Sequence, residues 1–237
     1  MGAAPIQLLP AVLVGLVGGT LVGLTGVGAG SVIAAGLLVA FPTLDAKLIV
    51  GSATAQAVVM KLFGVLARRR WQFREGRLGV AMALGAIPMA MAGAWASSLI
   101  GGDVLRPIMA VVLLLVGLVL VAQAVPRGAD GSTSTRVEDE AAPDPKRAQL
   151  GIVGALVGFI AGMTSIGTGT LFVSALIGPL RMDAHRAVAV ALLAGMMTLI
   201  VSGATHALLG HVDVVLAGGV LLGSVPGVLL GTATSRR

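Results

Sequence analysis

Long apolar runs separated by short polar segments dominate the chain. Five of these runs reach the roughly 20 residues that an α-helix needs to cross the hydrocarbon core of a bilayer. They predict transmembrane helices over 48–67, 78–100, 104–125, 187–209 and 212–231. The pattern therefore predicts an all-α polytopic membrane protein, with the lipid bilayer as its surroundings.

Two further apolar regions, 6–41 and 150–180, are interrupted by glycines. The interruptions read Gly-Val-Gly-Ala-Gly in the first region and Ile-Gly-Thr-Gly in the second. As one straight helix the first region would be roughly 54 Å long at about 1.5 Å per residue, whereas the hydrocarbon core is about 30 Å thick. We therefore expect each region to form a broken helical hairpin that bends at its glycines.

The segment 126–150 has a different composition. It carries nine charged residues, three prolines and a Ser/Thr cluster, which is typical of a solvated, flexible linker. This linker divides the chain into a first half, 1–125, and a second half, 151–237.

The two halves resemble each other at an offset of 138–139 residues. The matched pairs include glycines of both breaks, an Asp-Ala step and a proline, namely Gly23/Gly162, Thr25/Thr164, Gly28/Gly167, Gly30/Gly169, Asp45/Asp183, Gly85/Gly223, Pro88/Pro226 and Gly93/Gly231. The predicted helix 104–125 has no counterpart, so we expect the second repeat to lack the last helix of the first.

The basic residues distinguish two topologies. If each glycine-broken region crosses the membrane once, nine Lys and Arg lie on the cytoplasmic side and six outside; if each folds back as a hairpin, the division is thirteen against two. Cytoplasmic loops carry an excess of Lys and Arg. The hairpin model is therefore favoured; it makes the repeats inverted and places the linker and the C-terminus in the cytoplasm.

In the hairpin model the two glycine breaks meet near the membrane midplane. Irregular backbone at that depth is tolerated only inside protein or beside a cavity, and inverted repeats with broken helices are typical of a central transport site. The half-helices after the breaks would direct their N-termini and nearby hydroxyls toward a small oxyanion. The candidate substrate-binding residues are Thr25, Gly26, Gly28, Gly30, Ser31, Gln56, Thr164, Ser165, Gly167, Thr168, Gly169 and Thr170.

Composition excludes several other classes of protein. The net charge of +6 comes from short loops between apolar runs, which argues for membrane orientation and against nucleic-acid binding. The chain has no Cys, and His185, His206 and His211 lack metal-ligand spacing with carboxylates, so we expect no metal and no cofactor. No Gly-x-Ser-x-Gly motif surrounds Ser165, so we expect no enzyme. The ten Asp and Glu lie outside the predicted membrane segments, which argues against a cation pump.

Other polar and small residues have simpler interpretations. We expect Lys61 to extend toward the cytoplasmic surface rather than to attract a substrate, and His206 to lie at the membrane interface. Gln56 either bonds a neighbouring helix or lines the cavity. Isolated glycines are expected to let helices pack closely, as at Gly15, Gly18, Gly64 and Gly93.

These motifs together resemble the sulfite exporter TauE/SafE family, also called the toluene sulfonate uptake permeases. The resemblance rests on the duplicated glycine breaks, on Val50-Gly51-Ser52-Ala53-Thr54, and on His206-Ala-Leu-Leu-Gly210-His-Val-Asp213 followed by Gly223, Pro226, Gly227 and Gly231. The sequence departs from the family pattern at Ala29 and Thr168, where glycine is frequent, and in lacking an eighth helix.

The resemblance implies export or uptake of sulfite or organosulfonates across a bacterial inner membrane. It also allows a homo-oligomer. Transport of another small oxyanion or carboxylate, and a non-transporting structural role in the membrane, are the alternatives.

Overall fold

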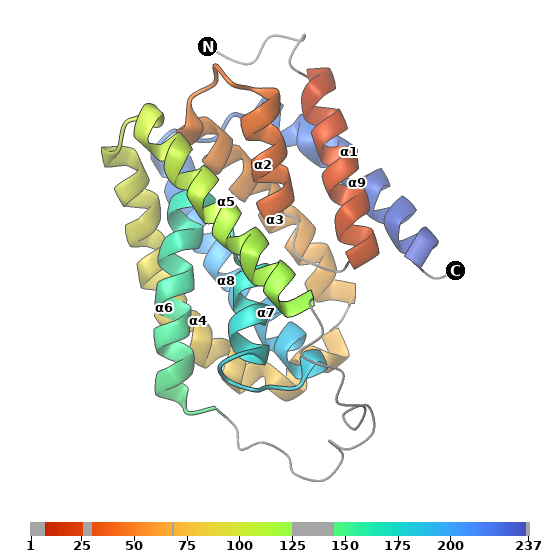
Figure 1. Cartoon of the computed structure of the whole chain (residues 1–237), viewed down its shortest axis with the longest axis vertical. Helices are drawn as coiled ribbons and strands as arrows, with labels where there is room; N and C mark the ends of the chain where they lie inside the picture. The colour runs from red at the N-terminus through yellow and green to blue at the C-terminus, as the bar shows by residue number, and fades with distance from the viewer. Residues whose placement is uncertain (1–7, 26–29, 68, 125–144, 236–237) are drawn as a thin grey trace.

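The computed structural model describes residues 8–25, 30–67, 69–124 and 145–235, and this part of the chain is helical with no strand. Figure 1 shows the helices as one bundle. In chain order they are α1 (Leu8–Thr25), α2 (Gly30–Ala40), α3 (Ala46–Ala67), α4 (Arg69–Leu99), α5 (Gly102–Ala124), α6 (Arg147–Thr164), α7 (Thr170–Ile177), α8 (Ala184–Leu208) and α9 (Val214–Ser235).

Five helical segments in the described residues are long and apolar enough to cross a membrane: Glu75–Leu99, Gly102–Ala122, Arg147–Thr164, Ala184–Leu208 and Val214–Thr234. The all-α, multi-pass prediction is therefore confirmed. Four helices span nearly the residues that hydropathy predicted. In contrast, α4 begins nine residues before the predicted 78–100, since the basic stretch ahead of the apolar run continues the helix.

Aspartates begin three of the helices. The Asp183 carboxylate accepts hydrogen bonds from the amides of His185 and Arg186, at 2.9 and 3.2 Å, and so caps α8. Asp45 accepts from Lys47 N ahead of α3, and Asp213 accepts from two amides of the first turn of α9. A side chain that satisfies the free N–H groups of a first turn fixes where the helix starts.

The segment 126–150, predicted as a linker, needs one correction. Its last four residues, from Arg147 to Leu150, already belong to α6, where Leu150 is fully buried. The Gln149 side chain accepts a hydrogen bond from the Lys146 amide at 3.1 Å and so helps to start the helix there. Residues 125–144, which carry most of the predicted linker, lie outside the described residues.

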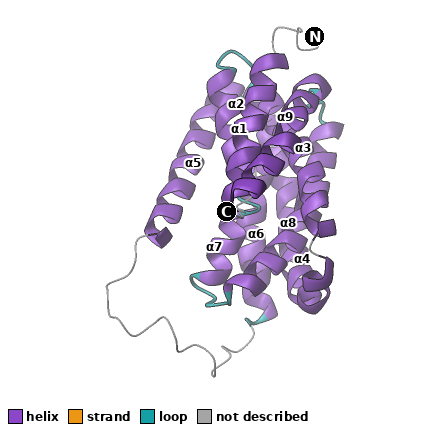
Figure 2. Ribbon diagram, turned by 90° about the vertical axis from the view of Figure 1, so that its right-hand side faces the viewer, coloured by secondary structure: helices purple, strands orange, loops and turns teal. Residues whose placement is uncertain are grey.

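The helices of the two halves run in opposite senses in Figure 1. From the end that carries the N-terminus, α1 runs into the bundle and α2 returns to that end. From the opposite end α6 runs inward, and α7 returns to the end where α6 began. Figure 2 shows the same arrangement, with the loop after α7 and the start of α6 at one end.

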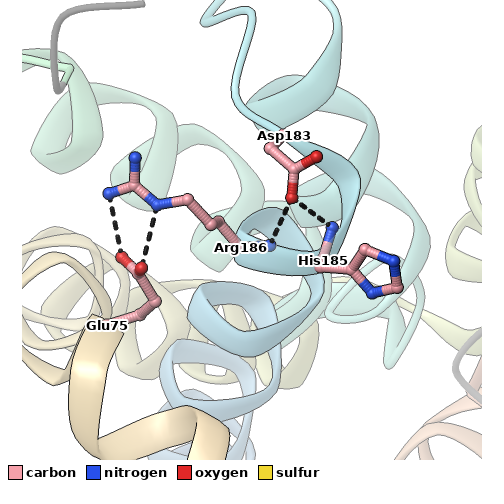
Figure 3. A network of polar contacts seen from close by, with 4 residues as sticks. All are labelled: Glu75, Asp183, His185 and Arg186. Carbon is pink, nitrogen blue, oxygen red and sulfur yellow. Dashed lines mark hydrogen bonds and ion pairs between the residues drawn. The ribbon is translucent and has the colours of Figure 1, made fainter. Parts of the chain in front are cut away.

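An ion pair joins α4 and α8 at the end where α6 begins (Figure 3). Arg186 Nε donates to Glu75 Oε1 at 2.8 Å, and its Nη2 donates to Oε2 at 3.1 Å. Glu75 belongs to the early part of α4 and Arg186 to the first turn of α8. The beginnings of α4, α6 and α8 share this end of the bundle.

Glycines bring two pairs of helices into backbone contact. Along α1, a Cβ added at Gly15 would meet the Val220 carbonyl of α9, and along α4 a Cβ at Gly93 would meet the Phe159 carbonyl of α6. The packing role expected of Gly15 and Gly93 is therefore confirmed. Gly18 packs against the side chain of Ile33, and the surroundings of Gly64 lie outside the described side chains.

The buried apolar side chains form two clusters. The first includes Ile33, Leu37 and Ile166, and the second includes Met82 and Phe172. Ile166 belongs to the break between α6 and α7, and Phe172 belongs to the first turn of α7. The break is therefore held between the two clusters, inside the bundle.

Candidate functional site

The chain between α6 and α7 interrupts the helix with a defined backbone conformation. Ser165 caps the end of α6 in the left-handed conformation, with φ of +61°, and its amide donates to the Ala161 carbonyl at 2.7 Å. Gly167 has φ of +105°, where a side chain is strained. Gly169 then precedes the first turn of α7. The glycine that the sequence pattern selected at 167 thus has a conformational reason.

The described parts of the two breaks touch each other. Gly30 is the first residue of α2, and a Cβ added there would lie 2.8 Å from the Ser165 carbonyl oxygen. Of the other candidates on the first break, Gly26 and Gly28 lie outside the described residues, and so does the side chain of Thr25 at the end of α1. Ser31 is buried on α2.

Several hydrogen-bond donors in the second break have no partner among the described residues. The hydroxyls of Ser165 and Thr170 are buried and make no hydrogen bond. The amides of Thr168, Gly169 and Thr170 likewise have no acceptor in the described part of the chain, whereas the next amide, of Leu171, donates to the Gly167 carbonyl. Buried polar groups are nearly always hydrogen-bonded. Among the described residues, the second break therefore gathers several donors that have no acceptor.

Not every candidate hydroxyl is available for a ligand. Thr164 Oγ1 donates to the Ile160 carbonyl at 2.7 Å and accepts from the Ile166 amide at 3.3 Å. Its hydrogen-bonding capacity is used within the end of its own helix. Thr164 thus shapes the break, while Ser165 and Thr170 present unused donors.

Gln56 lies on α3 and contacts a neighbouring helix. Its Nε2 donates to Ser224 Oγ of α9 at 3.2 Å, and Ser224 Oγ in turn donates to the Val220 carbonyl. This orientation leaves Gln56 Oε1 buried without a partner. Of the two interpretations of Gln56, the hydrogen bond to a neighbouring helix is confirmed, and the free atom is an acceptor rather than an anion-binding donor.

Lys61 is the residue at this site that the sequence interpretation missed. Its side chain is buried, and Nζ donates to the Thr168 carbonyl oxygen at 2.7 Å. The expectation that Lys61 extends to the cytoplasmic surface is therefore wrong, because the side chain turns inward to the second break. The sequence signal for a buried Lys61 is its position within an apolar run. The residues of α3 do not identify Thr168 as its partner.

His206 is buried near the end of α8, and its position relative to the membrane interface stays a prediction. Its Nε2 lies 2.8 Å from the Gly162 carbonyl, so Nε2 carries a hydrogen. Nδ1 lies 3.2 Å from His211 Nδ1 and, in the neutral ring, accepts from it. Burial lowers the pKa of His211 from its ordinary value, the Lys47 charge lowers it further, and Asp45 partly opposes both.

The described cavity lies apart from the breaks, at the bundle end where α4, α6 and α8 begin. Its volume is about 820 Å³, and the polar residues that line it are Glu75, Arg77, Lys146, Arg147, Asp183, His185 and Arg186. Basic side chains outnumber acidic ones there. No cluster of three or more His, Asp or Glu that could hold a metal occurs in the residues the structure describes.

Three comparisons with known proteins bear on the chain. A family model described as "Sulfite exporter TauE/SafE" matches residues 11–237. Two relatives come from Bacillus subtilis (strain 168). The "Probable membrane transporter protein YjnA" is 31% identical over 232 residues, covering 95% of this chain and 89% of that protein. The "Probable membrane transporter protein YunE" is 26% identical over 239 residues, covering 95% and 88%. No solved structure matches the chain.

Proposed function

Because the chain belongs to the sulfite exporter TauE/SafE family, we propose that it transports a small sulfur-containing anion, such as sulfite or an organosulfonate. The protein is a multi-pass membrane protein of a transporter family. The proposal adds the ligand and places it where the two glycine breaks meet, between Gly30 and Ser165.

One observation carries this proposal: the second break concentrates hydrogen-bond donors that have no partner in the described part of the chain. The hydroxyls of Ser165 and Thr170 and the first amides of α7 are available to oxygen atoms of a ligand. The N-terminus of a helix also carries a partial positive charge, which favours an anion. A sulfonate or sulfite group offers several oxygens in a compact arrangement, so it can accept several of these donors at once.

Alternating access between inverted repeats is the mechanism that we propose. Its support is the opposite sense of the two hairpins in Figure 1 and the exchanged packing of the halves, in which α1 contacts α9 and α4 contacts α6. Rocking of one repeat against the other would expose the midplane site to each side in turn.

The basic residues at one end of the bundle give the proposed orientation of the protein in the membrane. Arg77, Lys146, Arg147 and Arg186 line the cavity at the end where α4, α6 and α8 begin. By the positive-inside rule this end faces the cytoplasm of a bacterial inner membrane. The cavity would then attract anions to the cytoplasmic side of the transport site.

Transport in proteoliposomes tests the proposal. The purified protein is expected to carry ³⁵S-labelled sulfite or labelled methanesulfonate down a gradient, and acetate more slowly. Ser165→Ala and Thr170→Val should each lower the initial rate about fivefold or more, the effect of losing one hydrogen bond to a charged ligand.

The matched control is Thr232→Val, since that hydroxyl is exposed on α9 and bonded to the Val228 carbonyl of its own helix. Its transport rate should equal that of the unsubstituted protein. Acetate carried faster than both sulfur anions would identify a carboxylate transporter instead. No flux of any of the three anions by correctly folded protein would contradict transport.

A further inference from the structure

A buried lysine side chain lies beside the second break. Lys61 projects from α3, and its ammonium donates to the Thr168 carbonyl oxygen at 2.7 Å. An ammonium has three N–H donors. Within the described residues, that carbonyl is the one acceptor that Lys61 reaches, so most of its hydrogen-bonding capacity is unused.

No carboxylate accompanies Lys61 in the described part of the chain. The described elements that it contacts are the second break, through Thr168, and α8, at Gly195, and neither these elements nor α3 contain Asp or Glu. In the described part of the chain the ion pair between Arg186 and Glu75 is alone, and it lies at the end of the bundle. A charge inside a membrane normally pairs with an opposite charge, because an unpaired one is costly to bury.

The site is shaped to admit the lysine head group. Gly195 of α8 faces it: a Cβ added at that position would overlap the Lys61 ammonium and would lie 2.6 Å from the Thr168 carbonyl oxygen. A glycine is therefore needed at 195 for the ammonium to reach the break. The fold thus holds the charge in place with three elements, α3, α8 and the break.

We propose that Lys61 is the counter-charge of the transported anion and that its single charge selects monoanions over dianions. This rests on the proposed function, because it concerns the same site. A monoanion such as methanesulfonate or bisulfite forms a neutral pair with Lys61. A dianion such as sulfate leaves a net negative charge in the low-dielectric interior, where an uncompensated charge is strongly disfavoured.

Binding is measured separately from transport, by the rise in thermal unfolding midpoint of the detergent-solubilised, full-length protein with added anion. Methanesulfonate should produce a given rise in the midpoint at a concentration about tenfold or more below that of sulfate. Lys61→Met keeps the length of the side chain and removes its charge. It should weaken methanesulfonate binding by about tenfold or more, as expected for loss of a charge-assisted contact.

Gly195→Ala tests the same charge without removing it. The added methyl group must displace the ammonium from the Thr168 carbonyl, so methanesulfonate binding should weaken as it does in Lys61→Met. The matched control is Gly218→Ala of α9, since nothing lies within 4 Å of a Cβ at that position. It should bind methanesulfonate with unchanged affinity.

The outcomes separate this inference from the proposed function. If Lys61→Met binds methanesulfonate as tightly as the unsubstituted protein, or if sulfate binds as tightly as methanesulfonate, the inference is overturned. It is also overturned if the unsubstituted protein binds no monoanion. Binding that depends on Lys61 in a protein without flux would support the inference and contradict the proposed transport.

Discussion

Replacement of Gly167 by alanine isolates the contribution of the second break to transport. Gly167 has φ of +105°, and a Cβ added there would lie 2.6 Å from Leu171 Cδ1. The contact is with the far end of a flexible side chain, which can move. The main consequence is therefore backbone strain, about 1–2 kcal/mol for a residue with a Cβ in a left-handed conformation.

This strain has a calculable effect on transport. If the break relaxes to relieve it, the population of the anion-binding conformation falls by about 5- to 30-fold. The initial rate of sulfite or methanesulfonate flux in proteoliposomes should fall by the same factor. Insertion into the membrane should be unchanged, because the helices on both sides of the break are intact.

Gly210→Ala is the matched control for this prediction. Gly210 also has a left-handed φ, of +72°, and nothing lies within 4 Å of a Cβ at that position. It follows α8 at the end of the bundle remote from the cavity. The two variants should lose similar thermal stability in detergent, and only Gly167→Ala should lose flux. Equal flux in the two variants would refute the reasoning that the conformation of this break supports transport.

Three further predictions address packing, pH and topology. Gly158→Ala places a methyl group against the backbone of Ala86 and should destabilise the protein by about 1–3 kcal/mol. The control is Gly151→Ala on the same helix, where a Cβ meets nothing within 4 Å. Equal thermal midpoints for the two variants would contradict the close contact of α4 and α6. The folded state lowers the pKa of His211, so stability should be full above its ordinary value of 6.5 and fall as pH drops through the lower folded pKa. A thermal midpoint for His211→Gln with the same dependence on pH would contradict this. Because the chain has no Cys, Arg186→Cys and Asp213→Cys should react with a membrane-impermeant maleimide from opposite faces of the membrane, and labelling of both from one face would contradict the arrangement of α8.

The parts of the fold that depend on local sequence, namely the apolar helices and the glycine-containing break, were predictable. The apolar runs locate the long helices, and Asp45, Asp183 and Asp213 cap helices where the sequence changes from polar to apolar. The break after Thr164 was predictable from its glycines, because left-handed backbone there favours a residue without a side chain. The start of α4 was missed because a basic helical stretch has no apolar pattern to detect.

The contacts of polar side chains were less predictable, because they depend on helices far apart in the sequence. Lys61 lies 107 positions from the carbonyl that it binds, and nothing in its own helix identifies that partner. His206 likewise binds a carbonyl 44 positions away. Among the hydroxyls, sequence could not distinguish Thr164, which is satisfied by its own helix, from Ser165, which is not.

The most direct test is to locate a heavy-atom anion in the protein. A structure determined with 2-bromoethanesulfonate, using the anomalous signal of bromine, would show where a sulfonate binds. The proposed mechanism predicts a bromine peak beside the second break, with the sulfonate in contact with Ser165, Thr170 and Lys61. Bromine found only in the basic cavity lined by Arg77 and Arg147, with the break unoccupied at saturating ligand, would contradict it.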